Sequence, residues 1–369
     1  MGRNKIIRSL IFTPLLFIII SCSPKLYTTG KDFVASGNYG DAIAQFTKLI
    51  EENPEYTDAY VARADAYEKS GNKLEAANDL KRATAFEKKD KSIYYNAGKL
   101  FYELEQYDEA IPMLEKVTEL DKKHADAYKY KMDSYIALED YKKALPESNS
   151  LIELQKTAKN YSSRGYIQDK LENYNQAESD YRKSIELANN VLETYVALGD
   201  VLFKAKKYDQ SLAICNQALN IDSKCKEALW TRSKIYKEKI DYPNAINDLS
   251  KMIIFSPEDV DAFFARGLYY QEFNQHQSAI NDFSKVISLD PDNALAYFHR
   301  AKSNEEITEY EKAIADYKVF ANKSDESAET IEQLKLVEDR LYELNRESNK
   351  PNLTFIEPAE RTSNVLNVV

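Results

Sequence analysis

Side chains that could do chemistry are present in this 369-residue chain, but their spacing does not build a reactive site. The three histidines, His124, His276 and His299, show no His-x-x-x-His spacing of the kind that binds zinc from one helix. The nine glycines are scattered and form no phosphate-binding loop. With 60 acidic residues, neighbouring carboxylates are expected by chance and indicate solvated helix faces. We therefore expect no enzyme activity, no cofactor, no metal ion and no small-molecule substrate.

The three cysteines, Cys22, Cys215 and Cys225, are too few for a disulfide scaffold and lack the paired spacing of a zinc site. Cys215 lies within a helical pattern and is expected to be a small buried apolar residue. Cys225 lies in the loop that follows. The sequence leaves open whether these two are reduced or joined by a disulfide.

Residues 1–21 have the composition of a signal peptide. They contain three basic residues and no acidic one, and an apolar run from Leu10 to Ile20 is interrupted only by Thr13 and Pro14. The run is too short to span a bilayer comfortably, so cleavage is expected rather than insertion as a transmembrane helix.

The residues that follow, Ile19-Ile20-Ser21-Cys22, resemble the lipobox of bacterial lipoproteins. The resemblance implies that Cys22 receives diacylglycerol, is further acylated, for example with palmitate, and becomes the new N-terminus. It also implies a lipoprotein of the bacterial cell envelope. Ser23 after the cysteine favours the outer membrane by the sorting rule of enteric bacteria, and the absence of acidic residues in Ser23-Pro24-Lys25 favours a periplasm-facing protein. The alternatives are an ordinary signal peptide with a coincidental cysteine, or a buried N-terminal helix. The sequence does not decide the leaflet.

The rest of the chain is organised by a period of 34 residues. Small residues recur at one position of a helical pattern, and a second series of mostly small residues precedes the first by twelve. The first series is Ala42, Ala76, Ala110, Ala144, Ala177, Ser211, Ala245, Ala279 and Ala313, and the second is Gly30, Ala64, Gly98, Met132, Gly165, Gly199, Ser233, Gly267 and Ala301. Met132 is the one bulky exception. The step from Ala144 to Ala177 is 33, which predicts a one-residue deletion in the loop near residues 156–159.

This pattern, with tyrosine three residues before most of the small residues of the first series, resembles the tetratricopeptide repeat, a unit of two antiparallel helices, A and B. The resemblance implies an all-α solenoid, a right-handed superhelix of about nine helix-turn-helix repeats over residues 22–324. We expect one elongated body. An apolar stripe predicts a capping helix over residues 325–347. Residues 348–369 are expected to be an extended or disordered tail, or the start of a further β domain in a longer protein.

The same resemblance implies a concave groove lined by helix-A side chains at the second, fifth, ninth and twelfth repeat positions. Aromatic side chains there have no evident packing role and are candidates for partner binding. The alternative is that some of them turn sideways into the core between repeats. Lys129 is followed by Asp133 and not by asparagine, so the clamp with which some family members hold a C-terminal carboxylate is not expected. The groove candidates are Tyr27, Tyr95, Tyr102, Lys129, Tyr166, Phe203, Trp230, Phe264, Leu268 and Phe298.

The net charge of −10 disfavours nucleic acid as a partner, because phosphates attract clustered lysine and arginine. Charges of both signs with aromatic anchors favour an extended peptide or a helix of another protein. We therefore expect a membrane-anchored scaffold that binds a partner from an envelope or secretion complex. The alternatives are a glycan-binding lipoprotein and an accessory arm of a larger protein with a further C-terminal domain. The partner's identity and the oligomeric state are not encoded in these patterns.

Overall fold

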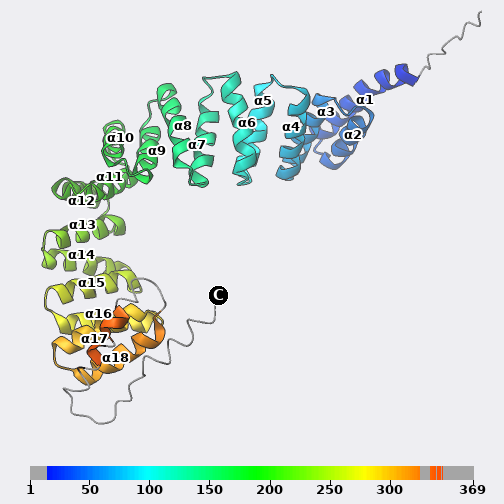
Figure 1. Cartoon of the computed structure of the whole chain (residues 1–369). Helices are drawn as coiled ribbons and strands as arrows, with labels where there is room; N and C mark the ends of the chain where they lie inside the picture. Colours follow the sequence, from blue (N-terminus) through cyan, green and yellow to red (C-terminus); the bar gives the residue numbers. More distant parts are fainter. Residues whose placement is uncertain (1–14, 325–332, 338, 342, 344–369) are drawn as a thin grey trace, which may run out of the picture. The chain divides into compact units, whose positions relative to one another are not determined.

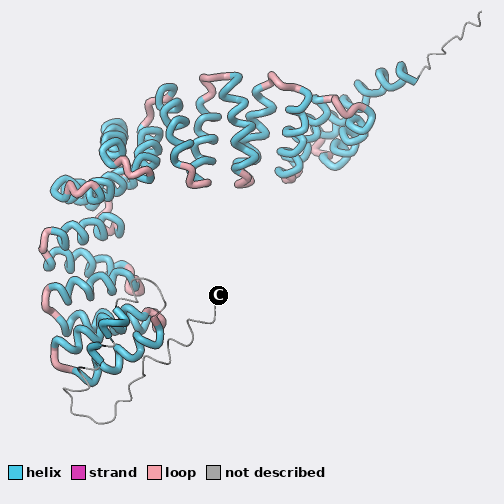
Figure 2. Tube along the Cα trace, in the orientation of Figure 1, coloured by secondary structure: helices cyan, strands magenta, loops and turns pink. Residues whose placement is uncertain are grey.

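The computed structural model describes residues 15–324, 333–337, 339–341 and 343, with side chains from residue 25 onward. Up to residue 324 these residues form eighteen α-helices joined by short loops (Figure 2). The side chain of Cys22, most of the expected signal peptide and the expected tail lie outside the described residues. The repeat pattern predicts one continuous body. The contacts within the chain instead divide it into two compact units, Met1–Asn189 and Asn190–Val369.

The first unit contains five A/B helix pairs, and each helix packs on the next (Figure 1). Odd-numbered helices are A helices and even-numbered helices are B helices. Their bounds are α1 (Leu15–Ala35), α2 (Tyr39–Glu52), α3 (Thr57–Lys69), α4 (Lys73–Phe86), α5 (Lys91–Glu103), α6 (Tyr107–Leu120), α7 (Ala125–Ala137), α8 (Tyr141–Leu154), α9 (Ala158–Lys170) and α10 (Tyr174–Leu187).

The second unit contains four more pairs built in the same way. Their bounds are α11 (Leu192–Lys204), α12 (Tyr208–Ile221), α13 (Lys226–Glu238), α14 (Tyr242–Phe255), α15 (Val260–Glu272), α16 (His276–Leu289), α17 (Ala294–Glu306) and α18 (Tyr310–Lys323). Helical residues 333–337 and 339–341 follow. Val337 is fully buried against the core of the last pair, with Leu334 and Leu341 packed beside it. Arg340 adds an ion pair to Glu305 of α17, 2.7 Å long.

The register predicted from the small residues is confirmed by the helix bounds. Eighteen helices make nine pairs, and every described loop from a B helix to the next A helix has four residues except one. The exception is the loop 155–157, between α8 and α9, which has three. The deletion inferred from the 33-residue step is therefore confirmed in this loop, where Thr157 caps α9 by accepting a hydrogen bond from the Asn160 amide.

Within a repeat, helix A approaches helix B at the small residue of the second series, and a larger side chain 16 residues later fills the space. A Cβ added to any of five glycines would come within 2.5 to 3.1 Å of that side chain, as for Gly30 and Phe46, Gly98 and Leu114, Gly165 and Tyr181, Gly199 and Cys215, and Gly267 and Phe283. In the fourth repeat the sizes are exchanged, because Met132 is paired in register with Ser148, and both are buried. The bulky exception in the sequence pattern is thus matched by a small partner.

Each A helix turns into its B helix through a residue in the left-handed region, with φ between 57° and 88°. Only the first two of these nine residues, Gly37 and Gly71, are glycine. Ile240 is the least suited of the others, since a β-branched side chain disfavours this conformation. Its side chain is 75% exposed, so no packing offsets the strain.

A second recurrent contact is an arginine–aspartate fork, in which an A-helix arginine donates from Nε and Nη2 to both carboxylate oxygens of a B-helix aspartate. The ten hydrogen bonds measure 2.6 to 2.8 Å. The third nitrogen, Nη1, donates to a side-chain oxygen on the preceding B helix, so each fork joins two repeats. The forks are Arg63–Asp79 with Thr47, Arg164–Asp180 with Asn149, Arg232–Asp248 with Asn216, Arg266–Asp282 with Ser250, and Arg300–Asp316 with Ser284.

Three of the remaining repeats show that the two fork positions change together. The fourth repeat has an ion pair there, between Lys131 and Glu147, 3.0 Å long. The third and sixth repeats have apolar residues at both positions, Ala97 with Met113 and Leu198 with Ile214. Replacing both partners of a buried ion pair with apolar residues costs little, whereas removing one leaves an uncompensated charge.

The close approach of the two helices predicts opposite effects for two glycine substitutions in helices of the first unit. Gly98→Ala should destabilise the protein by about 1–3 kcal/mol, because its Cβ would lie 2.7 Å from Cγ of fully buried Leu114. Gly40→Ala, in α2, should stabilise by about 0.5 kcal/mol, because nothing lies within 4 Å and alanine favours the helix. Thermal unfolding followed by far-UV circular dichroism measures both. A Gly98→Ala protein at least as stable as the parent would contradict the packing described here.

Candidate functional site

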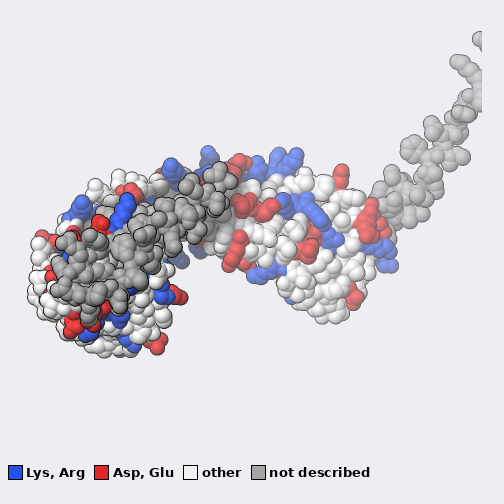
Figure 3. All heavy atoms as spheres, turned by 60° about the horizontal axis from the view of Figure 1, so that its bottom comes forward, with Lys and Arg blue, Asp and Glu red and all other residues white. Residues whose placement is uncertain are grey.

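The structure places five of the ten groove candidates in each unit. Tyr27, Tyr95, Tyr102, Lys129 and Tyr166 lie on A helices of the first unit, and Phe203, Trp230, Phe264, Leu268 and Phe298 lie on A helices of the second. Nine of the ten are at least partly exposed. Figure 3 shows acidic and basic side chains interspersed over the face it presents.

Three tyrosines of the first unit form one aromatic surface, which we call the tyrosine cluster: Tyr95 and Tyr102 of α5 with Tyr130 of α7. The Tyr130 ring centre lies 6.2 Å from that of Tyr95 and 4.9 Å from that of Tyr102. All three rings pack on the buried core beneath them and remain partly exposed. The sequence pattern predicted Tyr95 and Tyr102 but missed Tyr130, because it sits at the sixth repeat position, outside the expected groove positions.

Carboxylates lie close to the tyrosine cluster. Burial, together with the negative charge of Asp126, raises the pKa of Tyr95 to about 12. The pKa of Tyr102 is raised by burial and by Asp133. Burial also raises the pKa of Asp133, against the opposing effect of Lys129 and Lys159. The phenols therefore stay protonated at neutral pH and can donate hydrogen bonds.

The other two aromatic candidates of the first unit have different surroundings. Tyr27 packs on Phe46 and Tyr56, with ring centres 6.0 and 5.8 Å away, so much of its surface is used within the fold. Tyr166 is 39% exposed and has a ring contact with Tyr141. Tyr166 is therefore more accessible to a partner than Tyr27.

In the second unit, Phe203 and Trp230 are the accessible aromatic candidates. The Lys234 ammonium lies 4.8 Å from the centre of the Phe203 ring, a cation–π contact, and within 3.9 Å of Asp200. Trp230 and Leu268 are partly exposed and pack on a core that includes Leu249.

The structure corrects the prediction that Phe298 lines the groove, and it shows that Phe264 also has a packing role. Phe298 is only 5% exposed, because Phe320 and the residues around Val337 cover it, so its ring is not open to a partner. The Phe264 ring lies 5.6 Å from Phe283 and 5.5 Å from His299. The alternative that some helix-A aromatics turn into the core therefore holds for these two rings, wholly or in part.

The chemistry-bearing side chains outside the groove have structural surroundings. Cys215 and Cys225 are buried free thiols, and burial raises the pKa of Cys215 to about 11. His124 caps α7 by accepting a hydrogen bond from the Ala127 amide. Among the described residues, no group of three or more histidine, cysteine, aspartate or glutamate side chains could hold a metal ion. No described helix is both long and apolar enough to cross a membrane.

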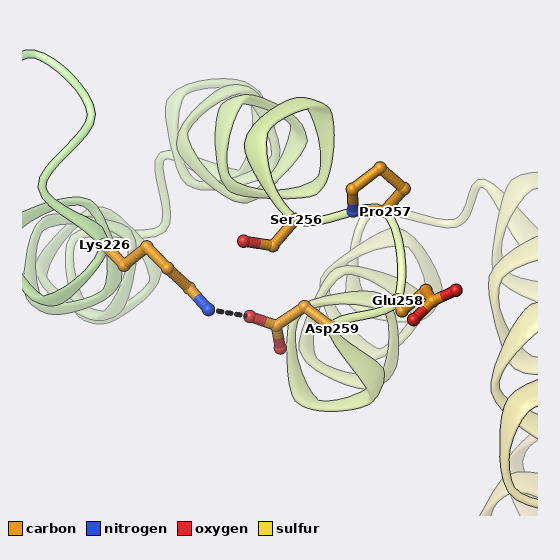
Figure 4. Close-up of a pocket in the computed structure, with 5 residues that line it drawn as sticks. All are labelled: Lys226, Ser256, Pro257, Glu258 and Asp259. Atoms are coloured by element: carbon orange, nitrogen blue, oxygen red, sulfur yellow. Dashed lines mark ion pairs between the residues drawn. The ribbon is translucent and has the colours of Figure 1, made fainter.

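An open hollow of about 500 Å³ lies between the start of α13 and the loop before α15, lined by Lys226 and residues 256–259 (Figure 4). Two of its three charged residues, Lys226 and Asp259, are paired with each other, and the third, Glu258, is exposed to solvent. Lys226 Nζ lies 2.6 Å from the Asp259 carboxylate, which also caps α15 by accepting a hydrogen bond from the Ala262 amide. The hollow therefore presents no buried unsatisfied group to a ligand.

Comparisons with known proteins fit this architecture. One sequence model of the tetratricopeptide repeat matches residues 27–90 and 264–329, and another matches residues 92–124, 158–191 and 192–225, together more than half of the chain. No curated protein matched the sequence.

Similar solved structures include the C-terminal part of a repeat-containing protein from Cytophaga hutchinsonii, with 15% identity, a TM-score of 0.55, and coverage of 65% of this chain and 99% of that chain. A repeat protein from Parabacteroides merdae has 18% identity, a TM-score of 0.47 and coverage of 67% and 98%. YrrB, described as a repeat protein with an unusual peptide-binding site, has 23% identity, a TM-score of 0.46 and coverage of 52% and 98%. At 15% identity, the similarity to the Cytophaga hutchinsonii protein supports the fold of this chain and says nothing about its function.

The buried imidazole of His299 predicts a pH dependence of stability in the second unit. Burial, with Lys302 nearby, lowers the pKa of His299 to about 4. Between about pH 6.5 and pH 4 the unfolded chain then binds a proton that the folded chain does not, so the free energy of unfolding falls as the pH falls. At pH 5 the loss relative to pH 7.5 should reach about 2 kcal/mol from this residue.

Urea unfolding followed by the fluorescence of Trp230, the only tryptophan, measures this loss. The variant His299→Gln serves as the control, since glutamine at this position does not titrate, and should lose less stability between the two pH values. Equal losses in the parent and the variant would show that His299 is protonated in the folded protein.

Proposed function

Because the chain belongs to the tetratricopeptide-repeat family, we propose that it is a membrane-anchored scaffold whose A helices bind a segment of another envelope protein. The observation that carries the proposal is the set of partly exposed aromatic rings on the A helices of both units. Proteins of this fold typically act as scaffolds. The partner in this proposal belongs to an envelope or secretion complex.

The physical basis of binding is the burial of rigid aromatic surface. Tyr102, Tyr130 and Trp230 each offer a partly exposed ring that packs on the buried core beneath it. The ring of Phe203 is also partly exposed and packs against Tyr208. A partner that covers such rings gains hydrophobic contact at little further cost in side-chain entropy, because the rings are already ordered. Interspersed charges around them set the orientation of the partner more than its affinity.

Membrane attachment in this proposal comes from an acyl group on Cys22, in the protein's mature form as an outer-membrane lipoprotein that faces the periplasm. Confinement of scaffold and partner to the same surface raises their effective concentration, so a weak contact with one segment suffices. The support for the anchor is the lipobox-like sequence that ends at Cys22.

The anchor predicts a specific chemical label. When the full chain is made in bacteria fed an alkyne-bearing palmitate, the parent should incorporate the label and sediment with membranes. Cys22→Ser should lose both properties, whereas Cys225→Ser, which alters a buried thiol, should keep them. Label retained by the Cys22→Ser protein would contradict lipidation at this residue.

Partner binding is tested by in-cell crosslinking and mass spectrometry with three forms of the chain. The first is the parent, and the second carries Tyr102→Ala, Tyr130→Ala, Phe203→Ala and Trp230→Ala. The third, a matched control, carries Phe86→Ala and Phe255→Ala, which remove exposed aromatics at the ends of B helices. We expect a partner protein to be captured by the parent and the control and to be lost, about tenfold or more, from the second form.

Identical captured proteins for all three forms would contradict the proposed role of the A-helix aromatics. Circular dichroism spectra of the three forms should match, which separates loss of binding from loss of folding.

A second candidate function is binding of a glycan, and the clustering of Tyr95, Tyr102 and Tyr130 in one place favours it. Sugar rings stack on aromatic faces, and neighbouring phenols can donate hydrogen bonds to hydroxyl groups. Binding of the full chain to an array of envelope oligosaccharides, lost with the tyrosines, would favour this function over the scaffold.

A further inference from the structure

One face of α7 places carboxylates on both sides of an aromatic ring. Asp126, Tyr130 and Asp133 are spaced by four and three residues, so they lie in one row along the helix. The Tyr130 ring also contacts Tyr95 and Tyr102 of α5, and α5 contacts α7 directly. The tyrosine cluster is therefore flanked by a carboxylate at each end.

These carboxylates lack the partners that similar groups have elsewhere. Neither Asp126 nor Asp133 has a hydrogen bond or an ion pair among the described residues. Asp65, at the same repeat position as Asp133 but two repeats earlier, is paired with Lys69 at 2.9 Å. Asp133 is half-buried, so its charge is incompletely solvated and favours an added cationic donor.

A cation of the chain itself already uses this surface. The Lys129 ammonium lies 5.3 Å from the centre of the Tyr130 ring, on the helix between the two aspartates. The aromatic face and the flanking carboxylates thus attract positive charge. Lys159 is the other cation that acts on Asp133, and Lys99 of α5 lies 3.6 Å from Glu103.

We propose that the tyrosine cluster, with Asp126 and Asp133, is a site for arginine side chains of a partner's extended segment. The inference rests on the proposed protein-binding function and specifies the chemistry of the bound segment. A planar guanidinium can stack on a tyrosine ring while its N–H groups donate to a carboxylate edge, which a point-like ammonium cannot do. The chain's net charge of −10 also favours the approach of a basic segment.

The spacing of the carboxylates fits two arginines. Asp126 and Asp133 are seven residues apart on α7, which corresponds to about 10 Å along the axis. In an extended polyproline-II segment, residues three apart lie on the same side and about 9 Å apart. A segment of the form Arg-x-x-Arg can therefore present one guanidinium to each carboxylate.

The test is fluorescence anisotropy with the full chain and three labelled peptides. The first is Ser-Arg-Pro-Pro-Arg-Ser, the second has lysine in place of each arginine, and the third has citrulline, which keeps the shape but removes the charge. We expect the arginine peptide to bind best and the citrulline peptide to bind about tenfold or more weakly, as for a lost charged hydrogen bond.

Variants separate this site from a structural role. Asp133→Asn should weaken binding of the arginine peptide about tenfold, whereas Lys129→Ala should strengthen it, because the competing internal cation is removed. The matched control Asp65→Asn, at the equivalent position without the tyrosine cluster, should leave the affinity unchanged. Damage to the fold would weaken binding in the first two variants alike, so the opposite signs are diagnostic.

Equal binding of the arginine and citrulline peptides, no effect of Asp133→Asn, or no binding of any peptide would overturn the inference. So would binding of an envelope oligosaccharide in place of the peptides. If the proposed protein-binding function itself were wrong, the result would be different, because the parent chain would then capture no partner in cells. If a partner is captured through the A-helix aromatics and the capture is insensitive to Asp133→Asn, the scaffold function stands and the arginine site does not.

Discussion

The structure depends on the contact between a small residue of each A helix and a larger side chain 16 residues later on its B helix. At five of the nine repeats the small residue is glycine, and the facing side chain fills the space that a Cβ would occupy. This contact fixes the distance between the two helices of a repeat, and the next repeat packs on the pair. The fourth repeat shows that the requirement concerns the summed volume of the two side chains, because Met132 and Ser148 meet it with the sizes reversed.

The arginine–aspartate forks add hydrogen-bonded links between neighbouring repeats to this packing. The small-to-large contact joins the two helices of one repeat, whereas a fork also reaches back to the preceding B helix and so joins neighbours. In a solenoid, where each repeat contacts only its neighbours, such links set how strongly one repeat's folding depends on the next. Each fork arginine donates hydrogen bonds from three nitrogens, two to the aspartate and one to the preceding B helix. Such complete hydrogen bonding is the condition under which a buried ion pair is tolerated.

The sequence predicted the helix pairs, the register and the shortened loop, because a 34-residue period with small residues fixes all three. The site was predicted less completely. Tyr130 was missed since it lies one position away from the template groove, although its spacing from Asp126 and Asp133 is visible in the sequence. Phe298 was wrongly placed in the groove, because nothing in its repeat position reveals that residues near Val337 cover it. The aromatic surfaces also fall in two units, a division that a regular repeat pattern does not reveal.

The forks are unevenly distributed within the first unit. They link the first repeat to the second and the fourth to the fifth, but the second and third repeats, and the third and fourth repeats, meet without one. Between the third and fourth repeats, the rings of Tyr95, Tyr102 and Tyr130 make part of the contact. Aromatic rings tolerate small sliding movements that a bidentate ion pair does not. A bound segment that covers the three rings would hold the third and fourth repeats together, so that occupancy of the site would stiffen the array on either side.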